Sequence, residues 1–107
     1  MIIKIYKVYK NFIKPVTYSV IKHGLYGMTK YFASLYAKDK VRVNMLSPGP
    51  VFNNHKKKFV NSLKTHIPMG RMAEKNDLDC SLLFLLNKKN LYFTGQNIVV
   101  DGGRTII

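Results

Sequence analysis

The stretch between Thr17 and Ser47 constrains the fold most, because a helical pattern of apolar residues leads directly into a strand-like run. The apolar residues recur at steps of four and three, which is the spacing of one face of an α-helix: Ile21, Leu25, Met28, Phe32 and Leu35. We therefore predict an amphipathic helix from about Tyr18 to Ala37, with Thr17 as its N-cap.

The segment after this helix has the features of a short β-strand. The run "VRVNMLS" (41–47) is apolar and contains β-branched residues, and turn-forming residues bound it at 39–40 and at the Pro-Gly-Pro sequence 48–50. A helix that leads directly into a strand is half of a βαβ repeat, which is the unit of a parallel sheet. The predicted fold class is therefore α/β.

The rest of the chain predicts one loop, one helix and one strand. Residues 53–70 are polar and basic, and we expect a mobile loop that can include one short helix. The run "NDLDCSLLFLLN" (76–87) predicts a helix with Asn76 as its cap, and "QNIVVDGG" (96–103) predicts a buried strand that ends in a turn. Residues 1–14 have no clear period and are expected to be an irregular N-terminal segment.

Length and composition exclude several classes of protein. A chain of 107 residues forms one domain at most, and 47% hydrophobic residues are too many for a disordered chain. The net charge is +13, but the lysines are spread along the chain and form a run of three only at Lys56–Lys58. We therefore expect no nucleic-acid partner, while a basic surface that steers an anionic substrate stays open.

Further partners and locations are constrained by what the sequence lacks. No apolar run is long enough to span a bilayer, so we expect no membrane partner. His23, His55 and His66 have no metal-ligand spacing, and we expect no metal site. The single Cys80 offers no disulfide framework, so we expect a small buried thiol and a reducing, cytoplasmic location.

A Tyr and a Lys four residues apart form a pair that some reductases use for proton and hydride chemistry. The spacing alone does not select one pair, because it recurs at Tyr6/Lys10, Tyr18/Lys22, Tyr26/Lys30 and Tyr36/Lys40. On the predicted helix, Tyr18 and Lys22 lie at the edge of the apolar stripe, whereas Tyr26 and Lys30 turn toward the opposite face. Tyr18 with Lys22 is therefore the pair best placed at a half-buried boundary.

The order of these elements resembles the C-terminal half of the short-chain dehydrogenase/reductase family. The matching features are the Tyr-x-x-x-Lys helix, "VRVN", "SPGPV", a polar segment, a helix and "GQNIVVDGG". The resemblance implies that residues 15–107 are the C-terminal portion of such a domain, an incomplete part of a Rossmann-like doubly wound parallel sheet. It also implies an NAD(P)-dependent oxidoreductase that acts on an alcohol or ketone. Residues 51–78 resemble members linked to surface-sugar and flagellin modification, which implies a sugar-derived small-molecule substrate.

The resemblance also implies roles for individual residues. Tyr18 would be the general acid/base, and Lys22 would favour the phenolate and bind the nicotinamide ribose, so that both are expected to be catalytic and cofactor-binding. Pro48 and Gly49 would shape the loop at the C-terminal edge of the strand, where ligands bind in open α/β sheets. The backbone of Val51 would meet the carboxamide of the cofactor, NAD or NADP.

Three other residues complete this comparison with the family. Asn44 is expected to be structural, with its amide tying neighbouring loops together. Asn53 stands where many relatives have a Thr that contacts the cofactor phosphate. Asp101 is the first residue of the sequence "DGG", which resembles the turn that follows the last strand in this family. Its glycines permit positive φ, and we expect a structural role for this turn.

Two parts of the family pattern are absent from this sequence. There is no Gly-rich pyrophosphate motif, and no Ser precedes Ser19. We therefore expect a truncated fragment that is inactive alone. It would associate with a missing N-terminal half, or form a homo-oligomer through the 18–37 helix, where Gly24 and Gly27 would permit close approach of another backbone. The alternative is a non-catalytic binding or assembly module derived from the same family.

Overall fold

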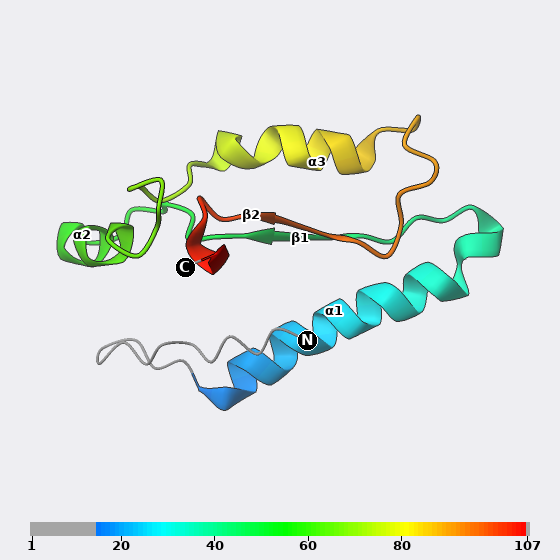
Figure 1. Cartoon of the computed structure of the whole chain (residues 1–107), viewed down its shortest axis with the longest axis horizontal. Helices are drawn as coiled ribbons and strands as arrows, with labels where there is room; N and C mark the ends of the chain where they lie inside the picture. Colours follow the sequence, from blue (N-terminus) through cyan, green and yellow to red (C-terminus); the bar gives the residue numbers. More distant parts are fainter. Residues whose placement is uncertain (1–14, 107) are drawn as a thin grey trace.

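The computed structural model describes residues 15–106, and Figure 1 shows its helices on both sides of a pair of strands. The α-helices and strands in chain order are α1 (Val16–Leu35), β1 (Met45–Pro48), α2 (Lys57–Lys64), α3 (Asp79–Leu86) and β2 (Asn97–Val100). Short 3₁₀ turns occupy Ala37–Asp39, Lys75–Leu78 and Arg104–Ile106. The segment 1–14, which we predicted to be irregular, lies outside the described residues.

The two strands form a parallel pair, as expected for a βαβ-type chain. The register runs from Met45 opposite Asn97 to Pro48 opposite Val100. The connection between the strands contains α2 and α3, and in Figure 1 α3 lies on one side of the strands while α1 lies on the other. This arrangement confirms the predicted α/β class with a parallel sheet, and α2 is the one short helix allowed for within 53–70.

The strand predicted at 41–47 starts later, at Met45. The backbone groups before it are hydrogen-bonded to residues outside β2. The Val43 N–H donates to Thr94 Oγ1 over 3.1 Å, and the Val43 carbonyl accepts from the Gly95 N–H over 2.8 Å. The Arg42 guanidinium donates to the Leu85 carbonyl at the end of α3 over 2.9 Å. The segment 41–44 therefore ties β1 to α3 and to the turn before β2.

Both predicted N-caps are wrong. Thr17 lies inside α1, and Pro15 occupies the cap position with its carbonyl accepting from the Tyr18 N–H over 3.0 Å. Asn76 lies inside the 3₁₀ turn that precedes α3, where Glu74 is the cap. Glu74 and Asp77 form a reciprocal capping box, which satisfies two backbone donors at once and so is favoured over a single Asn cap.

The described residues bury only a small core. The buried apolar side chains are Ala33, Leu63, Ile67 and Met72. The Cα radius of gyration is 16.0 Å, whereas a compact domain of about 100 residues has about 13 Å. Much of the apolar surface of this chain therefore remains uncovered within one copy.

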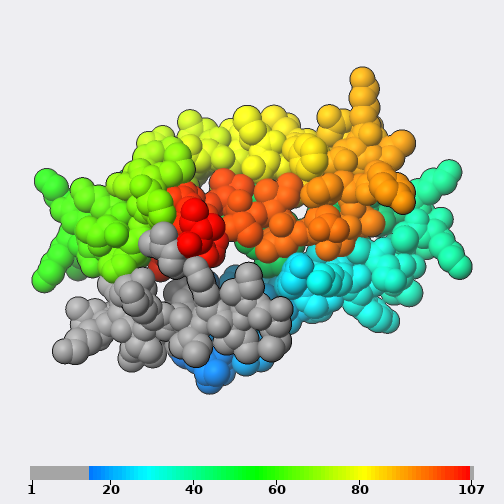
Figure 2. Space-filling view, viewed as in Figure 1, coloured from blue at the N-terminus to red at the C-terminus, as the bar shows by residue number. Residues whose placement is uncertain are grey.

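The uncovered apolar surface is concentrated on α1 and α3. The predicted stripe of α1 is largely exposed, with Ile21 at 62%, and α3 exposes Leu82, Leu83, Phe84 and Leu86. The prediction that Cys80 is buried is wrong, because it lies on this exposed helix. Figure 2 shows β2 and the loop before it, coloured orange to red, at the surface between α3 and α1.

Two features of α1 bear on its partners. A Cβ at Gly24 or Gly27 would meet no atom within 4 Å among residues 15–106, so these residues do not make the close approach predicted for the two glycines. Ala33 is the buried residue of this helix, and it faces Gly95 in the turn before β2. Among residues 15–106 no helix combines the length and apolar character needed to cross a membrane.

Candidate functional site

The predicted catalytic pair lies in the first two turns of α1. The Lys22 Nζ is 5.5 Å from the centre of the Tyr18 ring, within the range of a cation–π contact. The second pair on this helix is similar, with Lys30 Nζ 4.5 Å from the Tyr26 ring. Tyr18 is 39% exposed and Tyr26 is 36% exposed. Local geometry therefore does not distinguish the two pairs. The half-buried position that we predicted for Tyr18 but not for Tyr26 is shared by both residues.

The direction of α1 relative to the sheet does distinguish the two ends of the helix. In Figure 1 the first turn of α1 and the C-terminal ends of β1 and β2 lie toward the same end of the molecule. Ligands of open α/β sheets bind at this end of the strands. The pair in the first turns of α1 is therefore the one on the side of the sheet where a ligand is expected.

The loop after β1 is held tightly against the end of β2. The Gly49 N–H donates to the Val100 carbonyl over 2.8 Å, which continues the ladder beyond the last strand residue. A Cβ at position 49 would lie 2.7 Å from Asp101 Cα and 2.9 Å from Asp101 Cβ. Glycine is required here because a neighbouring backbone occupies the space of a side chain. Its role in binding a cofactor stays a prediction.

Val51 is held by an isolated parallel bridge to Ala73. The Phe52 N–H donates to the Ala73 carbonyl over 2.8 Å, and the Ala73 N–H donates to the Pro50 carbonyl over 2.9 Å. Because backbone groups alternate sides along an extended chain, the N–H and C=O of Val51 point away from Ala73. The loop thus presents one donor and one acceptor on its outer edge, which are the two groups that a carboxamide can pair with.

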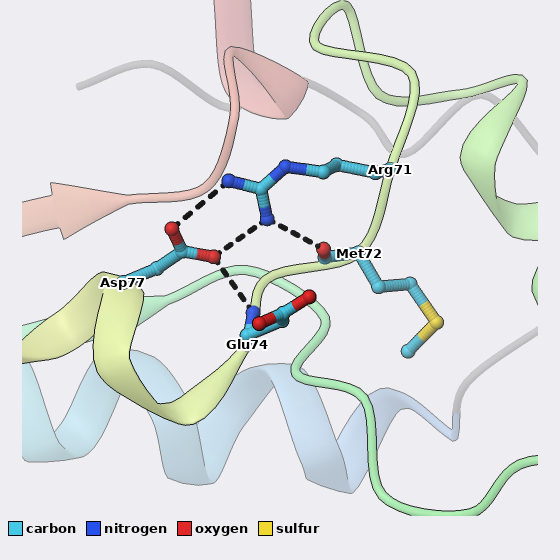
Figure 3. Close-up of polar contacts among 4 residues, drawn as sticks. All are labelled: Arg71, Met72, Glu74 and Asp77. Atoms are coloured by element: carbon cyan, nitrogen blue, oxygen red, sulfur yellow. Dashed lines mark hydrogen bonds and ion pairs between the residues drawn. The ribbon is translucent and has the colours of Figure 1, made fainter.

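An ion pair between Arg71 and Asp77, which was not predicted from the sequence, organises the segment facing this loop (Figure 3). The two guanidinium nitrogens donate to the two carboxylate oxygens over 2.6 and 2.9 Å. Arg71 also donates to the Met72 carbonyl over 3.1 Å, and Asp77 accepts from the Glu74 N–H over 2.7 Å. These hydrogen bonds from Arg71 and Glu74 lower the pKa of Asp77 to about 2.

Two cavities border the loop and this segment. The larger, of about 620 Å³, is lined by Phe52, Asn53, Asn54, Val60, Arg71, Met72, Glu74, Lys75 and Asn76. The smaller, of about 220 Å³, lies between Gly49-Pro50, the residues before α3 and the end of β2. Arg71 borders both cavities, and Tyr18 and Lys22 border neither.

Asn44 and Asp101 have the structural roles expected of them. The Asn44 amide donates to the Phe93 carbonyl over 2.9 Å, and its oxygen accepts from the Gln96 N–H over 3.1 Å. Asp101 accepts from the N–H groups of Gly103 and Thr105 over 2.9 and 2.8 Å. Within the described part of the chain, no cluster of His, Cys, Asp and Glu could hold a metal ion.

Comparison with known proteins identifies relatives over most of this chain. Residues 2–105 match the family model described as Enoyl-(Acyl carrier protein) reductase. The chain is 36% identical over 97 residues to the 3-oxoacyl-[acyl-carrier-protein] reductase FabG of Buchnera aphidicola, which covers 86% of this chain and 39% of that protein.

Solved structures have the same arrangement. A short-chain dehydrogenase from Leptospira borgpetersenii with bound NAD+ superposes with a TM-score of 0.81 at 37% identity, covering 88% of this chain and 37% of that one. YwfH, an NADPH-dependent reductase involved in bacilysin biosynthesis, gives 0.72 at 26% identity, covering 80% and 38%. The chain therefore spans less than two fifths of the length of these relatives.

Proposed function

This chain belongs to the short-chain dehydrogenase/reductase family, and we propose that it forms the proton-transfer and nicotinamide-contacting part of an NAD(P)-dependent oxidoreductase acting on alcohols or ketones. The observation that carries the proposal is the placement of one Tyr–Lys pair. Tyr18 and Lys22 lie in the first turns of α1, toward the same end of the molecule as the C-terminal ends of both strands.

Tyr18 moves the proton in this proposal. The Lys22 ammonium lies 5.5 Å from the centre of the Tyr18 ring. The Tyr18 hydroxyl donates its proton to the substrate oxygen during reduction and takes it back during oxidation.

The residues present fit the nicotinamide end of the cofactor, which is NAD or NADP. The outer edge of Val51 would offer a donor and an acceptor to the carboxamide. Lys22 would bind ribose hydroxyls, while Pro48 and Gly49 hold the loop against the end of β2. When bound, the cofactor supplies or takes up the hydride. The pyrophosphate would be held elsewhere, since no Gly-rich motif occurs in the sequence. The 107 residues alone are therefore proposed to be inactive.

The substrate is proposed to be a small polar molecule. The larger cavity has three amide side chains in its lining, those of Asn53, Asn54 and Asn76, and these suit the hydroxyls of a sugar-derived ligand. A 3-oxoacyl thioester, the substrate class in the name of the Buchnera relative, is the second candidate. The cytoplasmic location stays a prediction that rests on the single Cys80.

A chimera tests the proposed function. Residues 15–107 replace the matching segment of the Buchnera reductase, and reduction of a 3-oxoacyl thioester and of a sugar-derived ketone is measured with NADH and with NADPH. We expect cofactor-dependent turnover, which the Buchnera portion without this segment should not show. A chimera that folds, as judged by circular dichroism, but does not turn over would contradict the proposal and favour the non-catalytic assembly module.

We also propose that α1 pairs with a second copy or with a nucleotide-binding half supplied from outside these residues. The exposed stripe of this helix, including Ile21 and Met28, is the observation in favour. Light scattering of the purified chain should give at least twice the monomer mass of 12.3 kDa. Gly24→Leu, at a position where an added Cβ meets no atom of residues 15–106 within 4 Å, should lower that mass. A stable monomer that unfolds cooperatively would sink this idea.

A further inference from the structure

We propose that Arg71 and Asp77 are positioning residues that hold the nicotinamide-contacting loop in place through Ala73. The inference rests on the proposed function for its meaning, but the contacts that carry it belong to this chain alone. It assigns a task to an ion pair that no part of the proton-transfer chemistry uses.

The ion pair closes a short segment on itself. Arg71 and Asp77 are joined through two parallel hydrogen bonds, a geometry that fixes both orientation and distance. Arg71 also holds the Met72 carbonyl, and Asp77 also holds the Glu74 N–H. The backbone between the two partners is thus restrained at its start, at its middle and at its end.

Ala73, inside this closed segment, is hydrogen-bonded to the loop after β1. It accepts from the Phe52 N–H and donates to the Pro50 carbonyl, so that the two bonds flank Val51. Any displacement of Ala73 would displace both bonds. The orientation of the Val51 N–H and C=O therefore depends on where the ion pair holds Ala73.

The loop has a second, separate anchor. The Gly49 N–H is bonded to the Val100 carbonyl at the end of β2. This bond belongs to the strand ladder and does not involve the segment 71–77. Loss of the ion pair should therefore loosen the Val51 side of the loop while leaving the Gly49 side intact. A pair that only added general stability would loosen both anchors equally.

The two side chains are partly exposed, 51% for Arg71 and 31% for Asp77. An exposed pair contributes little to global stability, so its effect should be small and local. Solvent exposure also makes the attraction between the two side chains sensitive to salt, because the Debye length falls to about 3 Å at about 1 M ionic strength. Both properties can be measured.

Amide hydrogen exchange on the full 107-residue chain tests the inference. Arg71→Gln should raise the exchange rates of the Phe52 and Ala73 N–H groups about two- to fivefold, while the Gly49 N–H stays unchanged. Arg71→Lys, which keeps the charge but loses the fork, should give an intermediate increase. Lys75→Gln is the matched control, because it removes one positive charge from the same segment without breaking the ion pair, and it should change none of the three rates.

A second measurement covers the case in which the variants fold poorly. Adding about 1 M salt to the unaltered chain should speed exchange at Phe52 and Ala73 but not at Gly49. Equal acceleration at Gly49, no acceleration at Phe52 and Ala73, or unprotected amides in the unaltered chain would each overturn the inference. None of these readouts needs turnover, so a failure here is distinct from an inactive chimera, which would count against the proposed function instead.

Discussion

Tyr18→Phe is expected to lower the turnover of the chimera by about 10²- to 10⁴-fold, the usual contribution of a general acid/base. The phenyl ring still occupies the same place in the first turn of α1, so only the transferable proton is lost. The fold should be unaffected, which circular dichroism and the unfolding midpoint would show. Steady-state kinetics with saturating NADH or NADPH measures the effect.

Tyr26→Phe is the matched control for this experiment. Tyr26 lies on the same helix, has nearly the same exposure as Tyr18 and also has a lysine ammonium close to its ring. Removal of its hydroxyl should leave the rate within a few-fold, because that turn lies further from the C-terminal ends of the strands. Comparable losses at the two positions, or near-normal activity of Tyr18→Phe, would show that the wrong pair has been assigned.

Gly49→Ala is expected to destabilise the chimera by about 1–3 kcal/mol, the range for forcing extra atoms into a packed site. The added Cβ would lie 2.7 Å from Asp101 Cα, which is backbone and cannot rotate away as a flexible side chain can. To relieve the clash, the loop must move off the end of β2 and lose the bond from the Gly49 N–H to the Val100 carbonyl. Urea unfolding at one fixed protein concentration measures the free energy of unfolding.

Asn53→Ala serves as the control in the same loop. Its side chain is exposed, and the substitution keeps the backbone N–H that donates to His55 Nδ1 over 3.2 Å. The change in the free energy of unfolding should stay within about 0.5 kcal/mol. If Gly49→Ala costs no more than this control, the close contact with Asp101 does not restrict the loop.

The types and order of the helices and strands could be predicted from the sequence, whereas their ends could not. Hydrophobic spacing is a local property, so the stripe from Ile21 to Leu35 indicated a helix and the run at 41–47 a strand. The residue that caps a helix depends on which side-chain oxygens are available to accept from the first backbone N–H groups of that helix. Glu74 and Asp77 satisfy each other, and this reciprocal pairing displaced the Asn76 cap that the sequence favoured.

The sequence by itself determined the elements of this protein, its resemblance to a family and, through that resemblance, the candidate residues Tyr18 and Lys22. Only the tertiary structure decided which residues meet across the chain. The bridge from Val51 to Ala73 and the ion pair of Arg71 with Asp77 follow no period, since they depend on how the loop after β1 and the segment before α3 come together in space. The exposure of α1 and α3 was likewise undecided in the sequence, because an apolar stripe specifies that a face needs a partner but not whether one copy of the chain supplies it.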